Sequence, residues 1–111
     1  MAMVRYEDGV ADIAEHAINS TDDILKNPQL LYEKTPYDVE KIIGNTPGWY
    51  VETLGKGKHK GQGWMLRQYG GANGEPTGRM IQWHPGGGHH GPHPYWKVSD
   101  GKIVTRIGPQ F

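Results

Sequence analysis

The 111-residue chain contains no cysteine, only one phenylalanine and no long run of hydrophobic residues. The lack of cysteine excludes disulfide bonds and thiolate metal sites. No apolar run approaches the roughly 20 residues that a membrane-spanning helix requires, so we expect no membrane-spanning segment. Hydrophobic residues make up only 35% of the chain. This composition predicts one small domain with a thin core.

Acidic residues are scarce in the second half of the chain, although the formal net charge of the whole chain is zero. Residues 1–54 carry ten acidic and four basic side chains, whereas residues 55–111 carry two acidic and eight basic ones. Mutual neutralisation of the two halves within one fold is one explanation. We favour a polyanionic partner for the second half, because its basic residues coincide with five of the six histidines.

The residues that are abundant are glycine and proline, with 17 and eight copies. The spacing of apolar and capping residues predicts helices over residues 10–18, from Ser20 or Thr21 to Asn27, and from Thr35 to Gly44. Beyond Gly44 the pattern alternates, which predicts strands over residues 49–54, 64–69, 78–84, 95–98 and 102–107. We therefore expect an α+β fold, with N-terminal helices packed on a four- to five-stranded antiparallel sheet. We assign the functional domain to residues 28–111 and treat residues 1–27 as a leader or an N-terminal helix.

Four histidines, His84, His89, His90 and His93, stand within ten residues of a segment rich in glycine and proline. Histidine gives and takes a proton near neutral pH, so a cluster suits general acid–base catalysis on a phosphodiester. RNA carries its own nucleophile in the 2′-hydroxyl group, and such a reaction needs no cofactor. His84 ends a predicted strand, and His90 follows a glycine turn that can bring it back toward His84.

Two other interpretations of the histidine cluster remain open. Imidazole groups also bind Zn, Ni and Cu, but the spacing matches no known ligand pattern and almost no carboxylate lies nearby. A surface loop whose histidines only remain polar is the other alternative. We favour acid–base catalysis and expect no metal.

Cationic side chains on the predicted strands are suited to binding phosphate, because arginine and lysine donate charged hydrogen bonds to it. Tyr95 and Lys97 alternate in phase and so share a face of the sheet. Arg79 and His84 are out of phase, so a regular strand would place them on opposite faces. By the same rule Thr105 and Arg106 face opposite sides.

The aromatic residues divide into two groups. We expect Trp64 and Trp83 in the core, because the chain has few other large apolar residues. Tyr95 and Trp96 follow the histidine segment and are more accessible to a ligand. The glycine- and lysine-rich residues 55–63 lack the phosphate-loop pattern and are better suited to contacting a nucleic-acid backbone.

Two stretches carry a resemblance to a known family. Residues 77–91 hold an aromatic-His-Pro-Gly-Gly turn followed by His-Gly, and residues 94–99 hold Tyr-aromatic-Lys before a short strand. With residues 29–41 and the Gly48-Trp49 pair, this pattern resembles the C-terminal toxin domains of bacterial polymorphic and contact-dependent growth inhibition systems. Those domains are grouped in the barnase, EndoU, colicin and RelE-like superfamily.

The resemblance implies a metal-independent endoribonuclease toxin, directed at tRNA, that cleaves through the 2′-hydroxyl group. It implies partners in RNA and in a cognate immunity protein with an acidic interface, delivery from the producing cell surface, and action in the target-cell cytoplasm. The alternatives are a metal-dependent nuclease acting on DNA and a non-enzymatic RNA-binding module. The resulting candidate residues are His84, His90, Lys97, Arg79 and Tyr95 for catalysis, and Lys56, Lys58, Lys60, His89, His93, Trp96, Thr105 and Arg106 for substrate binding.

Overall fold

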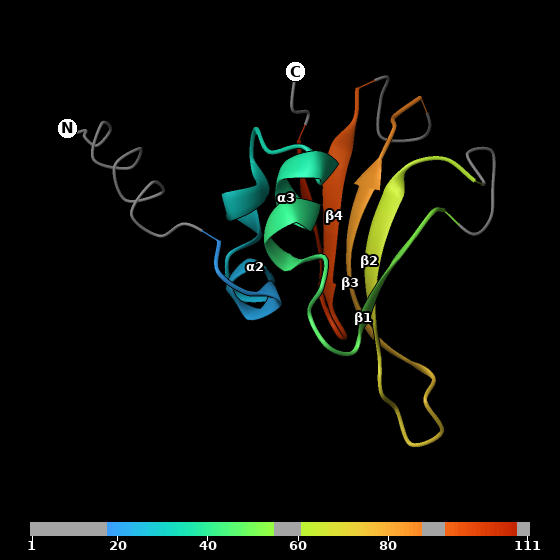
Figure 1. The fold of residues 1–111 in the computed structure, drawn as a ribbon. Helices are drawn as coiled ribbons and strands as arrows, with labels where there is room; N and C mark the ends of the chain where they lie inside the picture. Colours follow the sequence, from blue (N-terminus) through green and yellow to red (C-terminus); the bar gives the residue numbers. More distant parts are fainter. Residues whose placement is uncertain (1–17, 55–60, 88–92, 109–111) are drawn as a thin grey trace.

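The computed structural model of the chain describes residues 18–54, 61–87 and 93–108. These residues form a five-stranded antiparallel sheet with helices on one of its faces (Figure 1). The helices precede the strands in the chain, and the strands are ordered β1-β2-β3-β4-β5, so each strand pairs with its sequence neighbour. The predicted α+β class and the helix-on-sheet arrangement are confirmed.

The helical part is short and the sheet dominates the described structure. The helices are α2 (Thr21–Lys26), the 3-10 helix η1 (Pro28–Leu31) and α3 (Pro36–Ile43). None of the helices in the described ranges is long and apolar enough to cross a membrane. The strands are β1 (Trp49–Glu52), β2 (Trp64–Tyr69), β3 (Pro76–His84), β4 (Tyr95–Asp100) and β5 (Val104–Ile107).

Strand β4 is longer than its sequence pattern predicts. Ser99 and Asp100 lie beyond the predicted strand 95–98, yet they pair with Met80 and Arg79 of β3. The turn to β5 begins only after Asp100, whose carboxylate accepts the backbone N–H groups of residues 102 and 103 at 2.8 Å. The additional pairs extend the β3–β4 ladder. Side chains therefore project alternately to the two faces of the sheet along its whole length.

Both α-helices of the described residues begin where the sequence predicts, whereas the helix predicted over residues 10–18 falls, except for Ile18, outside the described residues. The Ser20 hydroxyl accepts the Asp23 backbone N–H, and the Asp23 carboxylate accepts the Ser20 N–H in return. Thr35 and Asp38 make the same reciprocal pair at the start of α3, with N···O distances of 3.2 and 3.0 Å. Such capping boxes satisfy N–H groups that the first helical turn leaves unpaired.

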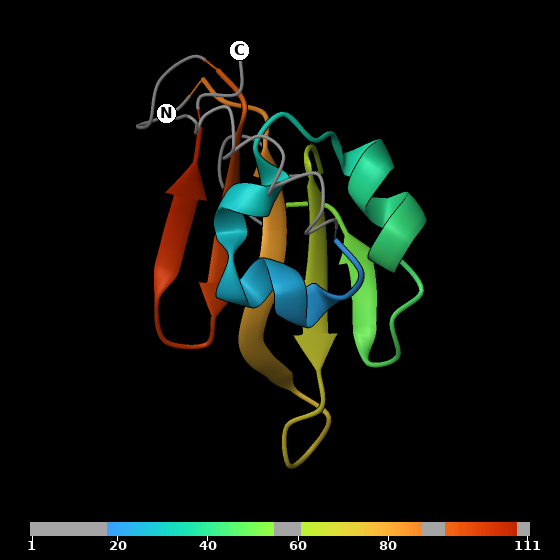
Figure 2. The same ribbon diagram turned by 90° about the vertical axis from the view of Figure 1, so that its left-hand side faces the viewer.

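The core lies between the helices and the sheet; Figure 2 shows the helices in front of the sheet. Trp64 and Trp83 both pack edge-on against Trp96, with ring centroids 5.9 and 4.9 Å away. The Trp64 indole donates to the Glu40 carboxylate of α3 at 2.7 Å, and the Trp96 indole donates to the Lys34 carbonyl at 3.0 Å. The core positions of Trp64 and Trp83 are thus confirmed.

Trp96 requires a correction. Sequence analysis placed it at the substrate, but its side chain is fully buried and forms the centre of the tryptophan cluster. Its ring faces the helices because β4 alternates regularly. Trp96 is therefore a core residue of this fold.

Candidate functional site

The two faces of the sheet differ in what covers them. The β3–β4 pairs run without interruption from Arg79–Asp100 to His84–Tyr95, so alternate residues project to opposite sides. Ile81 and Trp83 pack beneath the helices, which places His84 on the other side. We call this other side the open face; the strand registers assign to it Tyr50, Glu52, Met65, Arg67, Met80, Gln82, His84, Tyr95, Lys97, Ser99, Val104 and Arg106.

His84 is held in place by two contacts at the end of β3. Its ring stacks on the ring of Tyr95, its partner across the ladder, at a centroid distance of 4.9 Å and an interplanar angle of 15°. The backbone N–H of Gly86 donates to Nδ1 of His84 at 2.9 Å. Tyr95 is itself only 9% exposed. A buried ring and a backbone donor therefore fix the orientation of the imidazole.

The Gly86 contact determines which nitrogen of His84 carries the proton. Because Nδ1 accepts a hydrogen bond, a neutral imidazole in this position has its proton on Nε2. His84 in this state is a hydrogen-bond donor through Nε2. Taking up a second proton places a hydrogen on Nδ1, so the bond from Gly86 must then be given up.

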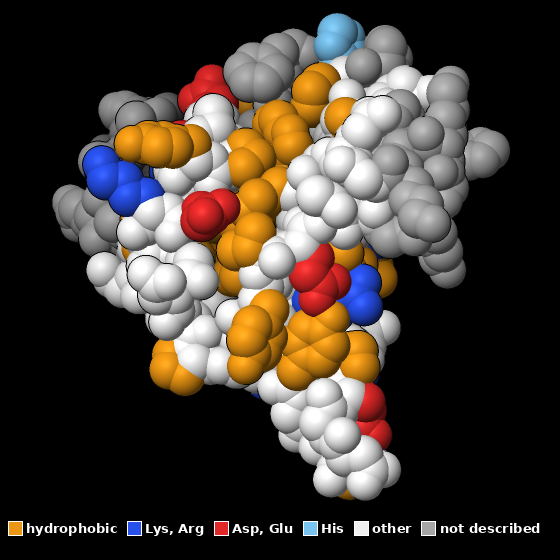
Figure 3. All heavy atoms as spheres, turned by 45° about the vertical axis from the view of Figure 1, so that its right-hand side comes forward, with side chains coloured by type: hydrophobic (Ala, Val, Ile, Leu, Met, Phe, Trp, Pro, Cys, Tyr) orange, Lys and Arg blue, Asp and Glu red, His pale blue; other side chains and the backbone are white. Residues whose placement is uncertain are grey.

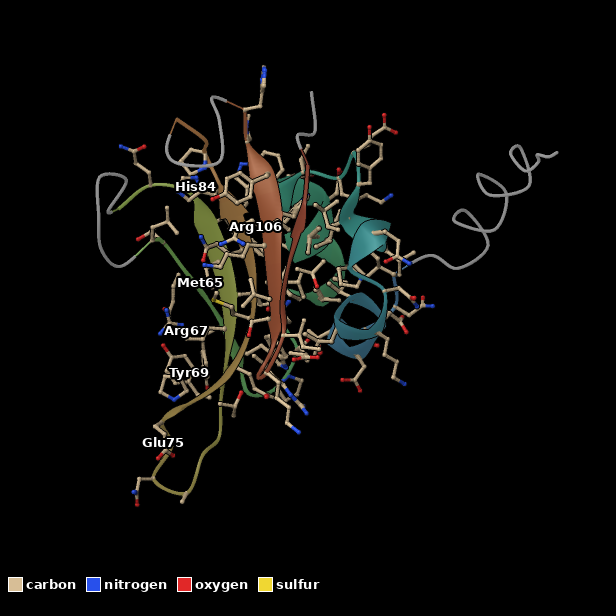
Figure 4. The ribbon with its side chains drawn as sticks, turned by 180° about the vertical axis from the view of Figure 1, so that it is seen from behind. Met65, Arg67, Tyr69, Glu75, His84 and Arg106 are labelled. Atoms are coloured by element: carbon tan, nitrogen blue, oxygen red, sulfur yellow. The ribbon has the colours of Figure 1, made fainter. Side chains whose placement is uncertain are left out.

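Lys97 lies close to His84 on the open face, and Arg106 lies one strand further away, beyond Lys97. Lys97 pairs with Gln82 on one side and with Arg106 on the other. Lys97 is thus the diagonal neighbour of His84 on the adjacent strand. The backbones of such diagonal neighbours are about 7–8 Å apart. Figure 4 shows His84 and Arg106 on the side of the sheet turned away from the helices. The predicted shared face of Tyr95 and Lys97 agrees with this register.

Arg79 and Thr105 lie on the helix-covered side, so the structure does not bring them to His84. Arg79 pairs with Asp100 and lines a pocket of about 340 Å³ together with residues of α2 and the β4–β5 turn. The backbone N–H groups of Ile103 and Lys102 lower the pKa of Asp100, and the Arg79 charge adds to this effect. The predicted supporting role of Arg79 in catalysis and of Thr105 in binding thus lacks a geometric basis.

Several candidates lie outside the described residues: His89, His90, Lys56, Lys58 and Lys60. His93 is described and exposed, two residues before β4 begins. The β3–β4 ladder ends at the His84–Tyr95 pair, so no strand register extends to His93. The structure therefore does not assign His93 to the group around His84.

The open face also carries a polar cluster that sequence analysis missed. Glu52 of β1 accepts a hydrogen bond from the Tyr69 hydroxyl, and its carboxylate lies 3.6 Å from Arg67 Nε. The hydrogen bond to Glu52 raises the pKa of Tyr69, and burial adds to the shift. Figure 4 shows Arg67 and Tyr69 on the same side as His84. Alternation within each strand identifies these residues as outward-facing, but only the β1–β2 pairing brings them together.

The open face thus combines a fixed imidazole with three cations, Arg67, Lys97 and Arg106, and one carboxylate, Glu52. Such a surface can bind phosphate groups and place a proton donor beside them. Within residues 18–54, 61–87 and 93–108, no three metal-ligating side chains group closely enough to hold a metal ion.

Comparison of this chain with protein-family models, with curated proteins and with solved structures gave no match.

Proposed function

We propose that the chain is a small endoribonuclease that cleaves RNA by attack of the 2′-hydroxyl group on the adjacent phosphate. The observation that carries this proposal is the placement of His84. Tyr95 and Gly86 fix its ring at the end of β3, beside Lys97 on a sheet face that helices leave uncovered. A rigid proton carrier next to cations fits a reaction that moves two protons around a phosphate.

The reaction needs a base and an acid but no added nucleophile. The base takes the proton of the 2′-hydroxyl, and the freed oxygen forms a bond to phosphorus. The bond between phosphorus and the 5′-oxygen then breaks, and the acid protonates that oxygen. The products are a 2′,3′-cyclic phosphate and a 5′-hydroxyl end.

We assign the acid to His84 and the base to His90. The Gly86 contact holds the neutral ring with its proton on Nε2. Once a second proton binds Nδ1 and the Gly86 contact is released, the doubly protonated ring gives its Nε2 proton to the 5′-oxygen. The assignment of His90 rests on its sequence position alone. Lys97 and Arg106 stabilise the charge on the phosphate, and Tyr95 positions His84.

The biological role that we propose rests on the resemblance of residues 77–99 to growth-inhibition toxin domains. We propose that tRNA is the substrate in a target cell and that a cognate immunity protein with an acidic interface neutralises the toxin. The exposed Arg106 and the half-buried Arg67 offer such a protein cationic contacts on the same face. Expression of the chain should arrest growth of the target cell, and this arrest should depend on His84. Relief of the arrest by co-expression of a small acidic protein would support this role.

A cleavage assay on total cellular RNA tests the ribonuclease proposal. We expect cleavage that persists in EDTA and leaves 5′-hydroxyl ends. Replacing a general acid costs about 10²–10⁴ in rate, so His84→Ala should lose at least about a hundredfold. Rates and the chemistry of the new ends are the measurements.

Arg79→Ala is the matched control, because Arg79 is exposed and lies on the other face of the sheet. It should retain cleavage at nearly the native rate. Full activity in a His84→Ala, His90→Ala double variant would contradict the proposal. Loss of activity in EDTA with rescue by Zn or Mg would favour the metal-dependent alternative, and RNA binding without cleavage would favour the binding module.

A further inference from the structure

A pair of tyrosines, one exposed and one half-buried, lies on the open face away from His84. Tyr50 of β1 and Tyr69 of β2 pack edge to face, with ring centroids 5.6 Å apart and an interplanar angle of 68°. Tyr50 is 57% exposed, whereas the hydroxyl of Tyr69 is bound by Glu52. Tyr69 is thus held by its hydroxyl and supports the ring of Tyr50, which is open to solvent.

A cation stands directly beside the exposed ring. Tyr50 and Arg67 are paired across the β1–β2 ladder and share the open face. Arg67 Nε faces Glu52, and Nη2 donates to the sulfur of Met65 at 3.6 Å. A guanidinium group has five N–H donors, so Arg67 retains donors for a phosphate. Figure 3 shows hydrophobic surface in contact with an acidic and a basic side chain on this side of the molecule.

The separation between Tyr50 and His84 follows from the register. Two strand spacings across the sheet and four residues along it place their backbones about 16 Å apart. The ring of Tyr50 is therefore too far away to touch the bond that His84 would act on. A base on Tyr50 belongs to another nucleotide of the same strand.

We propose that Tyr50 and Arg67 form a subsite for an unpaired nucleotide of single-stranded RNA, distant from the cleaved bond. The ring stacks on the base and Arg67 binds a neighbouring phosphate, a combination typical of single-strand binding surfaces. A base within a duplex is covered on both faces by its neighbours and cannot stack on the ring. The inference rests on the proposed ribonuclease function and names the substrate class as single-stranded RNA longer than a dinucleotide.

The alternative occupant of an exposed tyrosine is a protein partner. Two observations favour RNA. The subsite lies on the same face of the sheet as Lys97 and Arg106, separated from them by the uncharged Met80 and Gln82 of β3. The guanidinium group of Arg67 is oriented by its ion pair with Glu52.

Binding and cleavage by Tyr50→Ala test the subsite. Stacking on an aromatic side chain contributes enough per base that its loss should weaken binding of a single-stranded hexanucleotide about tenfold. The probe for binding is a 2′-O-methyl hexanucleotide, which cannot be cleaved, followed by fluorescence anisotropy. Cleavage of a dinucleotide should be unchanged in the variant, whereas cleavage of an RNA hexanucleotide should fall in kcat/KM.

Two further variants serve as controls. Tyr50→Phe keeps the ring and should bind as the native chain does. Tyr37→Ala removes an even more exposed tyrosine (73% exposed) from α3 on the other side of the sheet, and it should leave binding unchanged.

Unchanged hexanucleotide binding in Tyr50→Ala would overturn the subsite, and so would equal affinity for a duplex of the same length. Absence of any binding to the native chain would overturn both the subsite and the ribonuclease. Tyr50-dependent binding without cleavage would sink the ribonuclease and leave the subsite standing. Cleavage that is independent of Tyr50 for every substrate length would overturn the subsite and leave the ribonuclease proposal standing.

Discussion

At the scale of single residues, immediate neighbours decide which chemistry a side chain can perform. Tyr95 and Trp96 are adjacent in the chain, yet Tyr95 stacks on His84 while Trp96 donates to the Lys34 carbonyl inside the core. The sequence alone does not indicate which ring nitrogen of His84 carries a proton. The N–H of Gly86 turns its Nε2 into a donor, and the ring of Tyr95 holds it there.

The Tyr69–Glu52 contact gives a prediction for one residue. The hydrogen bond to Glu52 raises the pKa of Tyr69 above its ordinary value of 10.0. Since the folded pKa exceeds the unfolded one, this stabilisation is complete below pH 10 and is lost as pH rises through the folded pKa. We expect Glu52→Gln to lower the pKa of Tyr69 toward its ordinary value.

Absorbance of the tyrosinate ion during an alkaline titration measures this pKa. The chain has six tyrosines, so the signal of Tyr69 is the difference between the titrations with and without Tyr69→Phe. An unchanged difference curve in Glu52→Gln would show that Glu52 does not hold the hydroxyl.

At the scale of elements, helix starts are determined locally and strand partners are not. The capping box of α3 lies within four consecutive residues, from Thr35 to Asp38, and sequence analysis placed the start of this helix correctly. The end of β4 was placed two residues too early, because Ser99 and Asp100 are held by partners about 20 residues away in β3.

The α3 cap predicts a pH-dependent stability. The backbone N–H of Thr35, followed by its hydroxyl, lowers the pKa of Asp38 below its ordinary value of 3.8. A lowered folded pKa stabilises the fold above that ordinary value, and the effect is lost as pH falls through the folded pKa. Asp38→Asn should therefore unfold at lower urea concentration than the native chain at pH 7.

The same two proteins should converge when the urea series is repeated at acid pH. Protonation removes the charge of Asp38 in the native chain, so the difference between the two midpoints disappears. A difference that stays constant between pH 7 and pH 2.5 would exclude the charge of Asp38 as its cause.

At the scale of the whole molecule, the helices and the sheet share one core. Ile18 and Ile24 precede residue 28, where sequence analysis began the functional domain, yet both are buried among Leu31, Val39 and the sheet residues. The helices cover one face of the sheet and leave the other for the candidate site (Figure 1). The residues that stabilise the fold therefore lie on the helix-covered face of the sheet, and the candidate site lies on the open face.

Ile24 tests this assignment. Its side chain is fully buried, and truncation of a buried isoleucine to alanine costs about 2–5 kcal/mol. Ile24→Ala should lower the free energy of unfolding by about 3 kcal/mol while its RNA cleavage, measured below the new midpoint, stays close to native.

The control is Lys26→Ala, an exposed position in the same helix, which should unfold like the native chain. A loss below about 1 kcal/mol in Ile24→Ala would mean that α2 contributes little to the core.

The sequence by itself determined the α+β class, the two helix starts and most strand positions, because alternation and capping depend on residues a few positions apart. It also predicted that Tyr95 shares a face with Lys97 and that Arg79 is out of phase with His84. Only the tertiary structure decided which face each set occupies, since that depends on where the helices pack. The burial of Trp96 and the meeting of Glu52, Arg67 and Tyr69 depend on packing and strand registers between segments far apart in the chain.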